Sequence, residues 1–113
     1  MDPLITTATS RDARDRVARV AVLPVGSFEQ HGDFLPLITD TVVACLIARR
    51  ISAEYGLFLL PPVTLSCSHE HSDFAGTVSL SASTLAAVVS DAAESLRASG
   101  IDRLAIINGH GGN

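Results

Sequence analysis

Two polar, glycine-containing clusters hold most of the side chains in this sequence that could carry out chemistry. The first cluster, residues 26–32, contains Glu29 and His31 and is followed by Asp40, and the second, residues 108–113, contains His110. Glu29 and His31 stand two positions apart, so they project to the same side of an extended segment. Carboxylates and imidazoles without a thiolate suit Zn²⁺ or Mn²⁺. The residue types therefore predict a divalent metal site with a position left open for water.

The same clusters have simpler interpretations. Asp40 could cap a helix while Glu29 and His31 lie exposed in a solvated loop. Residues 108–113 could form a glycine-rich turn, or a loop that binds an anion at a helix amino terminus. A phosphate- or nucleotide-binding module would want the pattern GxxxxGK[ST] or GxGxxG, and neither occurs here.

A third polar group, His69, Glu70 and His71, lies in the serine-rich segment 63–81. These residues could belong to a surface loop. Two histidines around one glutamate could also line a pocket or carry protons.

Alternating strands and helices are expected to position these groups. Apolar runs predict strands at residues 19–25, 57–60 and 104–107, with Pro24 expected to end the pairing of the first. Helical periodicity predicts helices at 40–54 and 82–99. Such alternation implies right-handed crossovers and a parallel sheet, so the chain is predicted to be an α/β protein. Ligands bind such sheets at the carboxyl ends of the strands, where both clusters fall.

The helix ends and faces can also be predicted. Residues 1–18 could include a short helix capped by Thr7 or Ser10, and Gly56 and Gly100 are expected to end the two long helices. Thr39 or Asp40 could cap the first long helix, and Ser81 or Ser83 the second. The predicted core positions are Val42, Val43, Leu46, Ile47 and Ile51 in the first, and Leu85, Val88, Val89, Ala93 and Leu96 in the second.

Composition narrows the class of protein. The 113 residues are 47% hydrophobic and 18% charged, which favours a packed domain over a disordered chain. The net charge is −4 and all eight basic residues are scattered arginines, so no basic stripe for nucleic acid is present. We expect no signal peptide or membrane span. Cys45 and Cys67 match no metal or redox spacing, which favours reduced thiols and a cytoplasmic protein.

Four segments resemble the motifs of the creatininase family. Residues 23–32 are similar to its LPxGSxEQHG motif, and residues 35–40 to its LPLxTD continuation. Residues 68–77 are similar to its SxEHxxFPGT segment, and residues 108–113 to its NGHGGN motif. Four motifs in the right order cover the chain from about residue 19 to its end. They resemble the amino-terminal portion of these metal-dependent amidohydrolases.

The resemblance implies a three-layer α/β/α fold with a mainly parallel sheet, two divalent metal ions and a homo-oligomer, usually a hexamer. The ions would be zinc or manganese, with iron as a further candidate. By motif position, Glu29, His31, Asp40 and His110 are the expected metal ligands, with Asp40 between the two ions. A metal-bridging hydroxide would attack an amide or cyclic amide carbonyl of a small molecule or peptide. Glu70 and His71 are the expected catalytic residues, contacting substrate or moving a proton.

The chain departs from the family pattern at three positions. Gly112 stands where creatinine-hydrolysing members carry a glutamate ligand, which argues against creatinine as the substrate. Phe34 stands where members often have histidine or tyrosine, and Ala75 replaces a usual proline. Family substrates include creatinine, a formamidopyrimidine and the carboxyl-terminal dipeptide of a mycofactocin precursor, and the sequence does not choose among them.

The family's second half has no counterpart after the NGHGGN motif. We therefore expect residues 1–113 to form a single domain, truncated after that motif. The alternative to an active amidohydrolase is a catalytically incomplete fragment without activity of its own.

Overall fold

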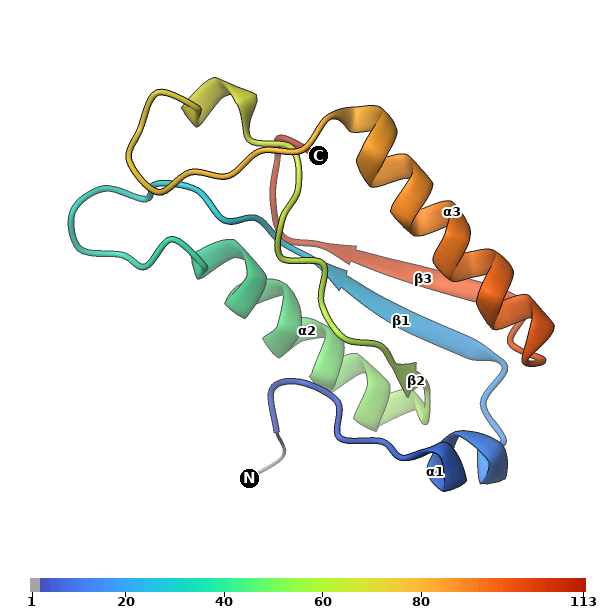
Figure 1. Ribbon diagram of the computed structural model, residues 1–113. Coiled ribbons are helices and arrows are strands. Elements are labelled where there is room, and N and C mark those ends of the chain that lie inside the picture. Colours follow the sequence, from blue (N-terminus) through green and yellow to red (C-terminus); the bar gives the residue numbers. More distant parts are fainter. Residues whose placement is uncertain (1–2) are drawn as a thin grey trace.

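Three parallel strands form the centre of the protein. The structure is a computed structural model that describes residues 3–113 (Figure 1). The strand order is β2-β1-β3, with β1 (Val20–Val25) between β2 (Phe58–Leu59) and β3 (Arg103–Asn108). The register pairs Ala21 with Phe58 on one side of β1, and pairs β1 with β3 along their full length on the other side.

Two long helices cover opposite faces of this sheet. Helix α2 (Thr39–Tyr55) connects β1 to β2, and α3 (Ala82–Ala98) connects β2 to β3. The two connections step across the sheet in opposite directions, so right-handed crossovers place their helices on opposite faces. Figure 1 shows the sheet lying between α2 and α3. The three-layer α/β/α architecture expected from the sequence is confirmed.

The central strand is buried as the sequence predicted, but its pairing does not stop at Pro24. Residues 21–25 are all buried. Pro24 pairs with Ile107, and its carbonyl accepts a 2.9 Å hydrogen bond from the backbone N–H of Val63. A proline loses only the N–H donor, and its carbonyl remains available for pairing. The expectation that the ladder ends at Pro24 is therefore wrong.

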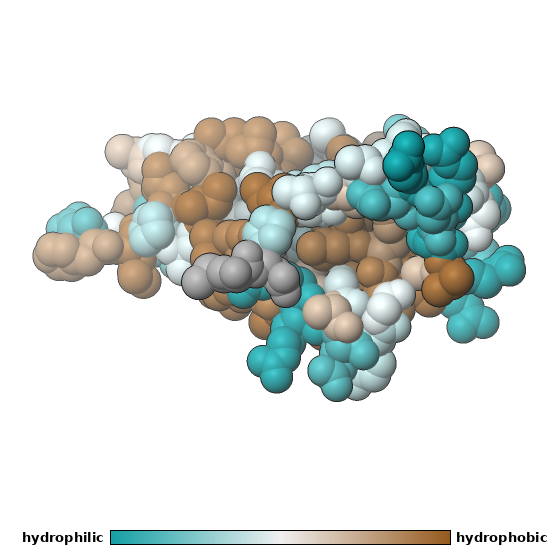
Figure 2. All heavy atoms as spheres, turned by 90° about the horizontal axis from the view of Figure 1, so that it is seen from below, coloured by the Kyte–Doolittle hydropathy of each residue, from teal (hydrophilic) through white to brown (hydrophobic). Residues whose placement is uncertain are grey.

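Helix α2 packs on the sheet through a seam of small side chains. Ala44, Ala48 and Ser52, the small-residue seam, are buried. The larger residues predicted to form its core stripe include Val43, Leu46 and Ile47, whose exposed fractions are 44%, 45% and 46%. That part of the prediction is wrong, because only small side chains leave room for the helix to lie close to the sheet. Figure 2 views the molecule from below relative to Figure 1 and shows hydrophobic side chains over much of that face.

Helix α3 follows the sequence prediction more closely. Leu85 is buried in a cluster with Leu23, Val25 and Cys67 on the opposite face of the sheet from α2. Ser81 caps the helix by accepting a hydrogen bond from the backbone N–H of Thr84. Of the predicted stripe, Val88 is 41% exposed, so the buried part of the helix is narrower than its apolar face.

Two short helices complete the structure. The amino-terminal helix α1 (Ser10–Asp15) is capped by Thr9, which forms a capping box with Asp12, and not by Thr7 or Ser10. A single 3₁₀ turn, η1 (His69–His71), interrupts the segment between β2 and α3. Within residues 3–113, none of the helices has the length and apolar character needed to cross a membrane.

The loops that follow the three strands meet at one end of the sheet. In Figure 1 the loop after β1, the segment carrying η1 and the residues after β3 gather at the end toward which the strand arrows point. The two polar clusters and the serine-rich segment therefore share one edge, as parallel strands require.

Candidate metal centre

The loop after β1 lies directly against the first turn of α2. A Cβ atom built on Gly26 would lie 2.2 Å from the Cα of Thr41, so only glycine allows this approach. The backbone N–H of Ser27 donates to Thr41 Oγ1 at 3.1 Å, and that hydroxyl donates to the Ser27 carbonyl at 3.0 Å. These contacts fix the position of Asp40, the neighbour of Thr41, relative to the strand end.

Asp40 lies between two imidazoles. Its Oδ1 is 3.0 Å from His31 Nε2, and its Oδ2 is 3.0 Å from His110 Nδ1. The Ser27 hydroxyl also donates to Oδ2 at 3.0 Å. The helix cap is Ile38, which makes no side-chain capping bond. The prediction that Thr39 or Asp40 caps the helix is therefore wrong, and so is the simpler interpretation in which Asp40 serves only as a cap.

His31 presents its Nε2 to Asp40 because its other nitrogen is already engaged. Nδ1 lies 3.0 Å from the carbonyl of Glu29, which can only accept a hydrogen bond, so Nδ1 carries a proton. In a neutral ring, Nε2 then faces Asp40 Oδ1 with a lone pair. The Glu29 carbonyl raises the pKa of His31, burial opposes that shift, and Asp40 adds to it. A proton or a metal ion between Nε2 and Oδ1 satisfies both atoms.

His110 repeats this arrangement from the other side. Its Nε2 lies 2.8 Å from the backbone carbonyl of Cys67, so Nε2 carries the proton and Nδ1 turns a lone pair toward Asp40. The side chain is only 5% exposed. Both oxygens of Asp40 thus face imidazole nitrogens whose partner nitrogens donate to backbone carbonyls.

Glu29 adds a buried carboxylate, one oxygen of which lacks a hydrogen bond. The residue is 5% exposed, and its Oε2 makes no hydrogen bond within residues 3–113. The nearest cationic candidates are His110 Nε2, 3.4 Å from Oε2, and His71 Nε2, 3.8 Å from Oε1. A buried carboxylate oxygen without a partner is costly, and a bound cation removes that cost.

The donor set fits one or more divalent cations. Glu29, His31 and Asp40 each offer a donor atom, and these atoms lie within 4.8 Å of one another. His110 joins the group through Asp40. Neither thiol participates, since Cys45 and Cys67 are buried, free and absent from the donor groups found among residues 3–113. Oxygen and imidazole donors of this kind suit Zn²⁺ or Mn²⁺.

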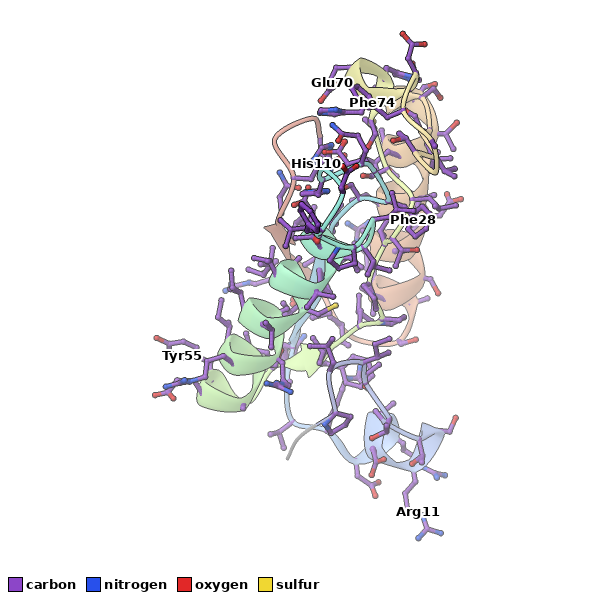
Figure 3. The ribbon with its side chains drawn as sticks, turned by 90° about the vertical axis from the view of Figure 1, so that its left-hand side faces the viewer. Arg11, Phe28, Tyr55, Glu70, Phe74 and His110 are labelled. Carbon is purple, nitrogen blue, oxygen red and sulfur yellow. The ribbon has the colours of Figure 1, made fainter. Side chains whose placement is uncertain are left out.

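Glu70 and His71 approach the centre from the η1 turn. With Glu29 they form a second group whose donor atoms lie within 4.8 Å of one another. A Cβ built on Gly112 would lie 2.9 Å from Glu70 Oε1, so this carboxylate lies over the glycine. In Figure 3, Glu70, Phe74 and His110 lie at one end of the molecule, away from Tyr55 and Arg11. His69 is engaged elsewhere, with Nδ1 3.1 Å from the Ser79 hydroxyl.

Three residues of the site were missed from the sequence. Ser27 donates to Asp40, and Gln30 contacts His71. Asn113 joins three segments by accepting from the Cys67 N–H and donating to the Gly26 carbonyl and Asn108 Oδ1. Their positions inside the two clusters were the only indication available, because hydrogen bonds between distant loops leave no periodic pattern.

Two positions at which the chain departs from the family pattern lie outside this centre. Phe34 is 97% exposed on the loop between β1 and α2. Ala75 is exposed in the segment that follows η1. In this structure neither side chain lies against the group of carboxylates and imidazoles.

Comparison with known proteins gives a consistent picture. The family model for creatininase (creatinine amidohydrolase) matches residues 5–113. The mycofactocin precursor peptide peptidase of Mycolicibacterium smegmatis is 39% identical over 113 residues, covering 95% of this chain and 45% of the relative. The creatinine amidohydrolase of Pseudomonas putida is 30% identical, with coverage of 80% and 37%. The chain thus spans less than half the length of these relatives.

Solved structures share the fold. A manganese creatininase superposes with a TM-score of 0.86 at 28% identity, covering 92% of this chain and 44% of the other. A creatininase variant described as the Zn–Zn type gives the same TM-score and identity, covering 97% and 46%.

Proposed function

Because this chain belongs to the creatininase family, we propose that its carboxylate–imidazole centre is part of a metal-dependent amidohydrolase. The reaction would be hydrolysis of a C–N amide or cyclic amide bond in a small molecule or peptide. Relatives are named as a peptidase, a creatinine amidohydrolase and a formylaminopyrimidine deformylase, all of which cleave C–N bonds. The observation that carries the proposal is Asp40, whose two oxygens face imidazole lone pairs. Beside them lies the buried Oε2 of Glu29, which makes no hydrogen bond within residues 3–113.

Glu29, His31, Asp40 and His110 would hold two divalent ions, zinc or manganese with iron as a further candidate, and Asp40 would lie between them. When bound, such ions lower the pKa of a coordinated water and polarise a substrate carbonyl. The carbonyls of Glu29 and Cys67 orient the imidazoles of His31 and His110, and such outer contacts usually strengthen metal binding. The Ser27 hydroxyl holds Asp40 Oδ2 in place.

Glu70 and His71 would contact the substrate. Glu70 is exposed at the mouth of the centre, so its carboxylate can accept or return a proton while remaining solvated. His71 is partly buried, with its Nε2 directed toward Glu29. The substrate amide would therefore lie between the η1 turn and the two clusters.

Creatinine is the least favoured of the family's substrates. The motif resemblance implies a glutamate at the position of Gly112 in creatinine-hydrolysing members. A Cβ added there would lie 2.5 Å from His110 Nε2, 2.6 Å from the Cys67 carbonyl oxygen and 2.9 Å from Glu70 Oε1. We propose a peptide amide or an acyclic formamide instead. The higher identity to the mycofactocin precursor peptide peptidase supports the peptide.

The proposal extends to the whole protein. The 113 residues would be the amino-terminal part of the domain, as the share of the relatives that they cover suggests. A homo-oligomer is proposed, supported by the exposed apolar side chains of α2. A cytoplasmic location is proposed, supported by the two free thiols.

Metal analysis combined with a substrate panel tests the proposed function. The chain would be loaded with Mn²⁺ or Zn²⁺, dialysed, and assayed with a mycofactocin precursor peptide, a formylaminopyrimidine and creatinine. We expect retained metal and metal-dependent cleavage of the peptide or the formamide. If the chain retains metal but cleaves none of the three, the catalytically incomplete fragment is the correct interpretation. If it retains no metal, the metal centre itself is wrong.

A further inference from the structure

Gln30 connects the loop after β1 to the imidazole of His71. Its Oε1 lies 3.0 Å from the backbone N–H of Gly32, which can only donate, so this atom must be the amide oxygen. The Nε2 of the same side chain lies 2.8 Å from His71 Nδ1. The backbone of Gly32 thus fixes which end of the Gln30 amide faces the imidazole.

The orientation of Gln30 determines the tautomer of His71. An amide NH₂ group can only donate, so His71 Nδ1 must accept and the ring carries its proton on Nε2. That Nε2–H points toward Glu29 Oε1 at 3.8 Å, which is too long for a hydrogen bond. Among residues 3–113 this N–H makes no hydrogen bond, so it remains free to donate to a molecule bound in the site.

Neighbouring contacts hold both residues in place. The backbone N–H of Gln30 donates to Thr77 Oγ1 at 3.1 Å, which ties the β1 loop to the segment after η1. The ring of Phe74 lies 5.9 Å from that of His71 at an interplanar angle of 51°. Phe74 thus lies beside the imidazole, and the hydrogen bond from Gln30 to Nδ1 sets the direction of the Nε2–H.

We propose that Gln30 is a positioning residue that keeps His71 as an Nε2–H hydrogen-bond donor to the carbonyl oxygen of the substrate. The proposal rests on the proposed amidohydrolase function. Donors aimed at the oxygen of a scissile carbonyl stabilise the negative charge that develops there. His71 would then act neither as a metal ligand through Nε2 nor as a carrier of protons, and Glu70 alone would move the proton.

The tautomer can be measured without turnover. In the ¹⁵N-histidine-labelled chain, long-range ¹H–¹⁵N correlation distinguishes a protonated Nε2 from a protonated Nδ1. We expect His71 to be the Nε2–H form and to remain so when Zn²⁺ is added, while the His31 and His110 signals shift. A wild-type His71 with its proton on Nδ1, or one that loses the Nε2 proton to zinc, would overturn the proposal.

Substitution of Gln30 tests whether this residue sets the tautomer of His71. In Gln30→Glu the carboxylate can only accept, so the proton of the neutral His71 ring should move from Nε2 to Nδ1. Asp73→Asn, in the same segment, is the matched control and should leave the His71 signals unchanged. The His69 signals provide an internal reference for folding in every spectrum. If Gln30→Glu leaves His71 with an unprotonated Nδ1, Gln30 does not set the tautomer.

Kinetics separate this inference from the proposed function. Where the enzyme cleaves a substrate, Gln30→Glu and His71→Phe should each lower kcat by about 100-fold, as removal of one oxyanion donor does, with a smaller change in KM. A switched tautomer with unchanged kcat would refute the donor role and leave the hydrolase intact. If the chain retains metal but cleaves no substrate, the fragment interpretation holds, and the donor role fails with the activity even where the spectra show Gln30 setting the tautomer.

Discussion

His110 Nδ1 lies 3.0 Å from Oδ2 of Asp40, although 70 positions separate the two residues in the chain. The contact joins the loop after β3 to the first turn of α2, so it forms only when β1, α2 and β3 are assembled. It also makes the candidate metal centre a sensitive indicator of the fold, because any shift of α2 changes this distance.

Replacing Asp40 should greatly weaken metal binding. Asp40→Asn keeps the shape but removes the charge that lies between His31 and His110. Loss of an outer partner alone weakens metal affinity by about 10–100-fold, so loss of this carboxylate should exceed about 100-fold. Titration with Zn²⁺ or Mn²⁺ by calorimetry measures the change. Asp33→Asn, on the exposed part of the preceding loop, is the control, and equal affinities of the two variants would contradict the assignment.

Replacing Gly26 should destabilise the fold by displacing α2 from the end of β1. In Gly26→Ala the new methyl group would meet the backbone of Thr41, and α2 would have to move. Overpacking of this kind costs about 1–3 kcal/mol of unfolding free energy. Gly111→Ala has open space around its Cβ and should change stability by no more than about 0.5 kcal/mol. Urea unfolding of both variants provides the comparison, and similar midpoints would show that α2 tolerates the methyl group.

Leu46 on α2 and Leu85 on α3 should respond very differently to the same substitution. Leu85 is 9% exposed, so Leu85→Ala should cost about 2–5 kcal/mol. Leu46 is 45% exposed on the outer side of α2, and Leu46→Ala should cost about 1 kcal/mol or less. Thermal unfolding measures both. A large loss for Leu46→Ala would mean that the outer side of α2 is covered, for example by another copy of the chain.

The metal-free chain should lose stability as the pH rises above the unfolded pKa of His31, about 6.5. The pKa of His31 is raised in the folded state, chiefly by the Glu29 carbonyl and with help from Asp40. A raised folded pKa contributes stability that is fully present below the unfolded value of about 6.5 and is lost as the pH rises through the folded value. Unfolding in the presence of a chelator at several pH values reveals this slope.

His31→Gln removes the titrating group and should flatten that slope. His69→Gln removes a histidine engaged with Ser79 outside the centre and should leave the slope unchanged. Added Zn²⁺ competes with the proton, so it should stabilise the wild-type chain most at the higher pH values. A chain whose stability increases from pH 6 to 8 without metal would contradict the assignment to His31.

Much of the fold could be predicted from the sequence because its elements are short and strongly patterned. The strand at residues 19–25 and the helix at 82–99 were predicted to within about a residue, and Gly56 and Gly100 end the two long helices in the left-handed region at φ 64° and 90°. The failure on α2 has a physical cause. Periodicity identifies two faces of a helix, but close approach to the sheet selects Ala44 and Ala48 over the larger Leu46.

The four proposed metal ligands could be singled out from the sequence, but the contacts between them could not. Glu29, His31, Asp40 and His110 were singled out by type and motif, and the structure brings them together. The Gln30–His71 hydrogen bond and the position of Glu70 over Gly112 depend on how the β1 loop meets η1. Such contacts arise from irregular backbone, for which the sequence offers no repeating pattern.

The small-residue seam of α2 has a consequence for engineering this protein. The methyl side chains of Ala44 and Ala48 set the distance between α2 and β1. Asp40 lies in the first turn of the same helix, so its position depends on that distance. A larger side chain at Ala48 would contact none of the proposed metal ligands, yet it would move Asp40 away from both imidazoles. Libraries meant to change substrate choice should therefore leave this seam alone and place their diversity in the loops that follow the strands.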